Sequence, residues 1–525
     1  MSKESTILSN GTIHSMDIAL ANPDWVEIVE GRIVRTGQGK RPSGNHLDLA
    51  GRTLLPGFHD AHVHPSLGGL ALIRCNLHDL SNLKDFQAQI AAYAQARPEA
   101  TWILGGGWAM EDLPNGLARA EWLDAVVPDR PVYLGSSEGH AAWVNSKALE
   151  LAGIDRHTPD PVDGRIERHP DGTPLGTLQE GAAHLVEKVL PPTQQSEVEQ
   201  GIVAAQEMLL SLGITTWQDA WVEKTTHHAY QALDASGRLL AMATGSLWWE
   251  RDRGMEQLPE LIERAKEVGR RYRPGSIKFM VDGVCENGTA SMVHPYLGTH
   301  DDRGLVFIPR EMLLEAVPAA MAAGLQPHFH AIGDQAIRDA LDAVAAGRPE
   351  HARVVRPQIA HVQVVDPADI PRFAQLHVAA NVQMLWACHD DTMVDLTTPR
   401  LGDHRSRWQF PFRSLIDAGA IFACGSDWSV STANPFPQME VAVSRLMPGM
   451  EVPFQKEQAI TREEALQGFT TGAAWVNHEE TRSGSITAGK AADLIIVDQD
   501  PLETNDLASV RVEMTLTDGQ VVFEG

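Results

Sequence analysis

Six side chains that can take part in metal binding occur at the ends of five separate apolar runs. His62 and His64 follow the run that begins at Leu55, and residues two apart on a β-strand point to the same side. Such a pair presents two imidazoles to one point, as a metal ion requires. The other four candidates are Lys278, His330, His361 and Asp427. Together the six residues predict one metal-dependent active site.

Each candidate has a simpler interpretation when it is considered alone. A histidine within a strand, such as His361, is more often a hydrogen-bonded core residue, and Asp427 could cap a helix. Lys278 could be a lysine at a strand edge. His328 precedes His330 by two residues, so it points inward as well and is an alternative ligand. We favour a shared site because the simpler interpretations require five independent coincidences.

The middle of the chain alternates between strand-like and helix-like runs. One amphipathic helix is predicted at Glu311–Ala323. The eight predicted strands are Thr53–Ala61, Ile214–Asp219, Ala241–Trp249, Ser276–Val281, Leu325–His330, Gln358–Val362, Val378–Met384 and Ala420–Cys424. This alternation predicts an α/β fold, a (β/α)₈ TIM-like barrel, in which catalytic groups gather at the C-terminal ends of the strands.

Both ends of the chain lack the strand–helix alternation of the middle and are predicted to form short strands joined by tight turns. We therefore predict a small β-sandwich formed by residues 1–55 and 480–525, and a metal-dependent barrel over residues 56–479. The gap after the first barrel strand is too long for one helix. We expect an inserted α/β subdomain at about residues 70–200.

Composition narrows the functional classes. The chain has 43 basic and 69 acidic residues, a formal net charge of −26, so it should repel nucleic acids and anionic membrane surfaces. Its four cysteines are widely spaced, which argues against a disulfide framework. The N-terminal residues show no apolar signal core, and no apolar run is long enough to span a bilayer. These features predict a cytoplasmic protein that acts on a small molecule.

Longer motifs surround the candidate ligands. They are Leu55–His64, Gly139–Leu149, Gly213–Thr216, His330–Asp334, Gly425–Asp427 and Gly489–Leu494. In these motifs, over nearly its whole length, the chain resembles the amidohydrolase superfamily, and specifically its YtcJ-like branch (amidohydrolase family 3), which includes N-substituted formamide deformylases.

The resemblance implies a role for each candidate ligand. His62 and His64 would bind the more buried metal ion together with Asp427, and His330 and His361 would bind a second ion. Members of the superfamily differ between one ion and two. Zinc is the default expectation for imidazole and carboxylate ligands, with iron, manganese and nickel as alternatives.

Lys278 corresponds to a lysine that many members carry as an N6-carboxylated residue, a carbamate that bridges both metals. An ammonium group cannot ligate a metal. A buried, neutral lysine can capture carbon dioxide and become an anionic oxygen ligand.

The resemblance also implies an activity, hydrolysis of a non-peptide C–N bond in an N-substituted amide, formamide, carbamate or cyclic imide. A metal-activated hydroxide would attack the carbonyl, and Asp427 would carry the proton to the leaving nitrogen. The alternatives are a metal-dependent esterase or lactonase, and a non-catalytic metal-binding regulatory protein. Family members are commonly dimers or larger, which implies a homodimer.

Candidate substrate contacts lie in the loops around the expected barrel mouth and in the insertion. They are His140, Asp282, Asn287, Gln383, Trp386 and Trp108. A structural role is at least as common for each of these residue types. The 13 tryptophans, against five tyrosines, suggest an aromatic mouth for an apolar substrate group, with the insertion as a lid.

Overall fold

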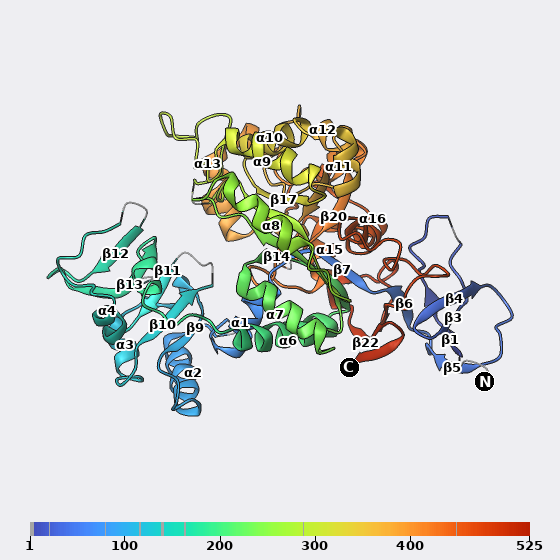
Figure 1. Ribbon diagram of the computed structural model, residues 1–525, viewed down its shortest axis with the longest axis horizontal. Coiled ribbons are helices and arrows are strands. Elements are labelled where there is room, and N and C mark those ends of the chain that lie inside the picture. Colours follow the sequence, from blue (N-terminus) through green and yellow to red (C-terminus); the bar gives the residue numbers. More distant parts are fainter. Residues whose placement is uncertain are drawn as a thin grey trace. The chain divides into compact units, whose positions relative to one another are not determined.

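The computed structural model describes residues 5–19, 21–78, 80–114, 117–137, 141–161, 164–286, 288–447 and 449–525. The chain divides into two compact units. One contains residues Met1–His64 and Gln206–Gly525, and the other contains Pro65–Ala205. Figure 1 shows the unit Pro65–Ala205 mostly in blue to blue-green, while the barrel of the larger unit has its first strand in blue and its later strands in green to orange.

Eight parallel strands form the centre of the larger unit, in the order β20-β19-β18-β17-β16-β15-β14-β7. Their bounds are β7 Phe58–Val63, β14 Ile214–Val222, β15 Met242–Trp248, β16 Tyr272–Met280, β17 Gln326–Ala331, β18 Gln358–His361, β19 Ala379–Val382 and β20 Ile421–Cys424. Because β20 also lies against β7, the sheet is a nearly closed barrel. The predicted (β/α)₈ fold is thus confirmed.

The first predicted strand, Thr53–Ala61, was wrong as a single element. It is two strands, β6 (Thr53–Pro56) and β7, which belong to different sheets. Gly57 separates them, and a Cβ at this position would lie 2.4 Å from Thr215 Oγ1. The chain therefore passes from the terminal sheet into the barrel at a point where only a residue without a side chain fits.

The helices of the larger unit pack by apolar stripes. In α9 (Arg310–Ala322), Leu313, Val317 and Met321 are buried at helical spacing. The bounds of α9 are close to those of the predicted helix, Glu311–Ala323. The helices are α7 Lys224–Ala235, α8 Leu258–Ala265, α9 Arg310–Ala322, α10 Asp334–Ala345, α11 Pro349–Val355, α12 Ile370–Gln375, α13 Thr398–Ser406, α14 Phe412–Asp417, α15 Pro435–Ser444, α16 Arg462–Gln467 and α17 Ala473–Val476. Helix α6 (Gln195–Ser211) spans the boundary between the units.

Two further sheets contain strands from the chain ends. A four-stranded sheet has the order β4-β3-β1-β5, and a five-stranded sheet has the order β2-β6-β21-β22-β23. The strands are β1 Ser5–Ser9, β2 Thr12–Ile13, β3 Trp25–Val29, β4 Arg32–Gly37, β5 Asn45–Asp48, β21 Leu494–Val497, β22 Val512–Thr517 and β23 Gln520–Glu524. Their buried side chains, such as Leu8, Val26, Leu54 and Ile496, form one core between the two ends of the sequence.

The smaller unit contains a six-stranded sheet with the order β12-β13-β11-β10-β9-β8. Its strands are β8 Cys75–Asn76, β9 Ile103–Trp108, β10 Val132–Ser136, β11 Ala141–Val144, β12 Gly164–Arg168 and β13 Pro174–Glu180. Its helices are α1 Pro65–Ile73, α2 Leu83–Ala96, α3 Ala120–Asp124, α4 Ser146–Leu151 and α5 His184–Glu187. Across the described part of the chain, no helix has the length and apolar character needed to cross a membrane.

The core shared by the chain ends leads to a prediction about stability. Ile496→Ala removes a side chain with 0% exposure and should lower the free energy of unfolding by about 2–5 kcal/mol, because it leaves a cavity. Urea denaturation monitored by fluorescence measures this change. The matched control is Ile18→Ala, since Ile18 is 94% exposed and its loss should be nearly neutral. Equal effects of the two substitutions would show that the core formed by the two chain ends does not stabilise the fold.

Candidate metal centre

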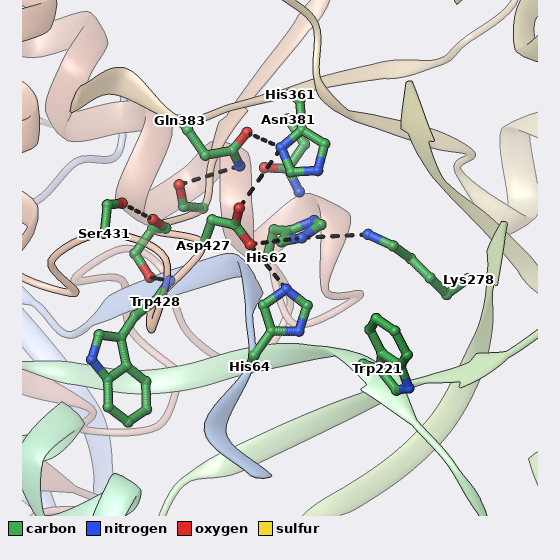
Figure 2. Close-up of polar contacts among 12 residues, drawn as sticks. His62, His64, Trp221, Lys278, His361, Asn381, Gln383, Asp427, Trp428 and Ser431 are labelled. Atoms are coloured by element: carbon green, nitrogen blue, oxygen red, sulfur yellow. Dashed lines mark hydrogen bonds and ion pairs between the residues drawn. The ribbon is translucent and has the colours of Figure 1, made fainter. Parts of the chain in front are cut away.

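The C-terminal ends of four barrel strands bring the candidate ligands together. His62 lies on β7, Lys278 on β16 and His361 at the end of β18, while Asp427 follows β20. Figure 2 shows these side chains pointing toward one another. Distant segments of the sequence therefore converge at the barrel mouth, as the strand order requires.

The carboxylate of Asp427 is at the centre of the cluster. Its Oδ1 lies 2.9 Å from His64 Nε2 and 3.2 Å from His62 Nε2. Its Oδ2 lies 4.0 Å from His361 Nδ1. Ligand atoms of His62, His361 and Asp427 all lie within 4.8 Å of one another, a separation that one metal ion can bridge.

Main-chain contacts hold the two sides of this cluster in place. The amide of Asp427 donates to His62 O at 2.8 Å, and the amide of His64 donates to Trp428 O at 2.8 Å. Asp60 Oδ1 accepts from the amides of His62 and Ser426. The end of β7 is thereby fixed against the loop after β20.

Backbone strain accompanies two of the candidate ligands. The φ angles of His361 and Asp427 are 79° and 54°, in the left-handed region that side chains other than glycine rarely adopt. Such strain persists only where the surroundings hold it, and it is concentrated at functional sites. Here it turns two strand-end side chains toward the same point.

Burial keeps the imidazoles neutral. Burial, and next the charge of Lys278, hold the pKa of His62 well below its usual value. The same causes lower the pKa of His330 to about 4, while burial and then His330 lower the pKa of His361 strongly. Neutral imidazoles carry the lone pair that a metal ion needs.

Asp427 is ionised despite its burial. Burial alone would raise its pKa, but the hydrogen bond from His64 and the electrostatic interactions with His361, His64 and Lys278 outweigh it and hold the pKa below its usual value. The site therefore contains a carboxylate that is 4% exposed. A buried anion of this kind is stable only with compensating charge or hydrogen bonds.

Lys278 approaches the cluster from β16. Its Nζ lies 3.4 Å from His62 Nε2, and the side chain is almost fully buried. Burial lowers the pKa of Lys278 to about 7, although Asp427 opposes the shift. A substantial fraction of this amine is thus neutral near neutral pH.

The two histidines of β17 occupy different levels. The ring of His330 lies 4.4 Å from that of His361, centroid to centroid, and its Nε2 lies 3.3 Å from Gly283 O. His328 lies deeper, with its Nε2 2.8 Å from His62 Nδ1 and its Nδ1 2.8 Å from Ser246 Oγ. Both ring nitrogens of His328 therefore have partners away from the Asp427 carboxylate.

These residues fit a divalent cation. The donors are neutral imidazoles and one carboxylate, the set that zinc and related ions prefer. In addition, His64 Nδ1 is buried and has no hydrogen-bond partner among the described residues. The tight group of His62, His361 and Asp427 takes members from both of the ligand sets that the family resemblance implied.

The predicted substrate contacts are distributed differently. Gln383 Oε1 lies 2.9 Å from His361 Nδ1, and the ring of Trp386 stacks on that of His361 at 5.4 Å. Asp282 has 0% exposure, and its carboxylate accepts three main-chain N–H groups, from Ser291, Ile332 and Gly333. These three side chains thus support the cluster or its loops.

Trp108 is a core residue of the smaller unit. It has 0% exposure, and its Nε1 donates to Leu134 O at 2.9 Å. Its ring also contacts that of Trp143 edge to face. The remaining two candidates, His140 and Asn287, lie outside the described residues.

The sequence analysis missed a layer of polar residues beneath the ligands. Ser246, Gln218, Gln326, Gln358 and Asn381 point into the barrel and are at most 1% exposed. Each is a polar residue on the inward face of a buried strand, which is the signal that could have revealed them. The layer is connected to His62 through His328.

Solved structures share the fold and define its class. A crystal structure of an uncharacterised metal-dependent hydrolase from Pyrococcus furiosus superposes with a TM-score of 0.77 and 25% sequence identity, covering 95% of this chain and 100% of that one. The fold is that of a metal-dependent hydrolase, and His62, His361 and Asp427 at the barrel mouth form a group that could hold a metal ion.

Sequence comparison identifies the family. The model of the amidohydrolase family matches residues 46–523, so the chain belongs to this family. YtcJ of Bacillus subtilis (strain 168) is 28% identical over 99% of both chains. The N-substituted formamide deformylase of Arthrobacter pascens is 28% identical over 99% of this chain and 98% of its own. The resemblance to the YtcJ-like branch is therefore confirmed.

The close contact at Gly425 gives a test of the cluster's geometry. A Cβ at this position would lie 2.5 Å from His62 Cβ and 2.6 Å from His62 N. Gly425→Ala should displace His62 and lower Zn²⁺ affinity about tenfold or more, as measured by chelator competition. Gly275→Ala on β16 is the control, because its Cβ would meet no described atom within 4 Å. Wild-type affinity in Gly425→Ala would show that His62 is not a ligand.

Proposed function

We propose that the chain hydrolyses a non-peptide C–N bond of a small molecule, of the N-substituted amide, formamide, carbamate or cyclic imide class. The observation that carries the proposal is the buried Asp427 carboxylate, which lies within 4.0 Å of the imidazoles of His62, His64 and His361. The likeness to an N-substituted formamide deformylase over nearly the full length supports this bond type.

The ligand set proposed for the cation is His62, His64, His330, His361, Asp427 and a modified Lys278. A divalent ion, with zinc as the first choice, would supply Lewis acidity, which lowers the pKa of a bound water molecule and polarises a carbonyl oxygen. The remaining chemistry belongs to the side chains of the chain itself.

Asp427 is suited to move a proton. Its lowered pKa makes it a carboxylate at neutral pH, so it can accept a proton from the attacking water. It would then donate that proton to the departing nitrogen. An amine leaves far more readily than an amide anion, so C–N cleavage needs this second step more than ester cleavage does.

Lys278 would complete the ligand set after reacting with carbon dioxide. The lone pair of its neutral Nζ forms an N–C bond to carbon dioxide, and the nitrogen releases one proton, which leaves a carbamate. The lowered pKa of Lys278 supplies the neutral amine. The neutral amine of Lys278 would thus become a carbamate, which can bind a cation through its anionic oxygen atoms.

Two tryptophans next to Lys278 support an apolar substrate group. Trp248 pairs with Lys278 in the register of β15 and β16, and it stacks on Trp221 at 3.8 Å. Figure 2 shows Trp221 on the same side of the cluster as Lys278. Both indoles are only partly buried, so they offer a flat apolar wall to an N-substituent.

Asp427→Asn should reduce turnover at least about 10³-fold on a panel of matched amides, formamides, imides, esters and lactones, because the neutral amide cannot accept the proton. The zinc-loaded wild type should cleave members of the C–N group. Asp391→Asn, at an exposed position, is the control and should keep wild-type rates. Near-normal turnover in Asp427→Asn would exclude the proton transfer, and wild-type cleavage of esters alone would favour an esterase.

Lys278→Ala should lose most bound metal and activity, and short carboxylic acids such as acetate should restore part of both by replacing the carbamate oxygen atoms. Wild-type protein equilibrated with ¹³C-bicarbonate should show a carbamate resonance that Lys278→Ala lacks. Lys266→Ala, which removes a surface lysine paired with Glu263, is the control. Full metal content and full activity in Lys278→Ala would contradict the bridging role.

A further inference from the structure

The two ring nitrogens of His62 face different surroundings. Its Nε2 faces Asp427 Oδ1 at 3.2 Å and Lys278 Nζ at 3.4 Å, on the side of the candidate cation. Its Nδ1 lies 2.8 Å from His328 Nε2. For Nε2 to bind a cation, the ring proton of neutral His62 must be on Nδ1. The partner of Nδ1 must therefore act as an acceptor.

Beneath His328 lies a set of four buried amides, Gln218, Gln326, Gln358 and Asn381, which we term the amide array. Main-chain carbonyls, which can only accept, fix its orientation. Gln326 Nε2 donates to Arg356 O and Val476 O, both at 2.9 Å. Asn381 Nδ2 donates to Ala61 O at 2.9 Å. The amide oxygen of Gln326 is consequently turned inward.

The remaining amide hydrogen bonds follow from this orientation. Gln326 Oε1 accepts from Gln218 at 3.0 Å and from Gln358 at 3.3 Å. Gln358 also donates to Gln218 Oε1 at 2.7 Å, and its own Oε1 accepts from Asn381 at 2.7 Å. The last free N–H of Gln218 donates to Ser246 Oγ at 3.0 Å. Every N–H of the amide array thus has an acceptor.

Ser246 connects the amide array to His328. Its Oγ accepts from Gln218 and lies 2.8 Å from His328 Nδ1. A hydroxyl oxygen has two lone pairs, so it can accept from Gln218 and from His328 Nδ1–H together. Cation binding at His62 Nε2 requires this arrangement, in which His328 carries its proton on Nδ1 and presents a bare Nε2 to His62. With its proton on Nδ1, His62 directs the lone pair of Nε2 at the position of the candidate cation.

We propose that His328, held by Ser246 and the amide array, is a positioning residue that accepts the Nδ1–H of His62 and so keeps His62 Nε2 available as a metal ligand. This inference rests on the metal site of the proposed function and extends it to a residue outside the ligand set. Groups that orient metal-bound histidines typically affect metal affinity by 10–100-fold.

The test measures Zn²⁺ binding by chelator competition, without substrate, in the full-length chain. His328→Leu removes the acceptor and should weaken Zn²⁺ binding about 10–100-fold. His328→Gln can place an amide oxygen near the former Nε2 and should retain affinity within about threefold of the wild type. His227→Leu is the control, because His227 is equally buried but bonds Tyr272 and Glu267 instead of a candidate ligand.

A serine pair tests the next link. Ser246 and Ser276 are partners in the register of β15 and β16, and both have 0% exposure. Ser246→Ala removes the acceptor for His328 and should weaken Zn²⁺ binding. Ser276→Ala removes only a donor to Gln326 O and should not. Melting temperatures of the metal-free variants separate this effect from lost stability.

Three outcomes would overturn the inference. Wild-type Zn²⁺ affinity in His328→Leu would exclude a positioning role. Equal losses in His328→Leu and His328→Gln, with equally lowered melting temperatures, would show that His328 only supports the fold. If the wild type itself binds no Zn²⁺, the metal site of the proposed function fails and the inference fails with it. The first two results leave the proposed function intact.

Discussion

The structure of the barrel mouth depends on one buried carboxylate. Asp427 is an anion beside His62 and His361, whose pKa values are lowered by burial, and burial also lowers the pKa of Lys278 to about 7. With Lys278 neutral, the Asp427 carboxylate contributes a charge of −1, which attracts a cation. A carbamate on Lys278 would make the charge −2, so carbamate formation and cation binding must stabilise each other. A second buried anion without the cation, or a buried cation without enough anionic ligands, would be unfavourable in a site that excludes water.

The barrel supplies the rigidity that this charge arrangement needs. The two strands that close it, β7 and β20, are also those that carry or precede His62, His64 and Asp427, and main-chain hydrogen bonds connect them at the site. The left-handed residues His361 and Asp427 lie where the strands end. Closing the fold and assembling the ligands are thus one structural event, so a change at Gly425 would affect both.

The sequence predicts the parallel barrel because strand-like and helix-like runs alternate along the chain. It predicts that the candidate ligands converge because they occur at the C-terminal ends of these strands. It does not predict the division at Gly57, since the apolar run continues through that residue and only the contact with Thr215 shows the break. It also does not separate His328 from His330. Both have the same parity on β17, and depth in a barrel depends on the stagger between strands, which no single segment encodes.

The polar layer under the site shows why depth matters. Most barrels of this type fill their interior with branched apolar side chains. An apolar layer here would pack well, but it would leave His328 Nδ1 without a hydrogen-bond partner. Although Asn381 Oδ1 has no partner among the described residues, each N–H group of the amide array has an acceptor, which offsets much of the usual cost of burying amides. Its hydrogen bonds also have one direction, fixed by main-chain carbonyls. Through the Ser246 oxygen this layer offers an acceptor to the Nδ1–H of His328, which an apolar layer cannot do.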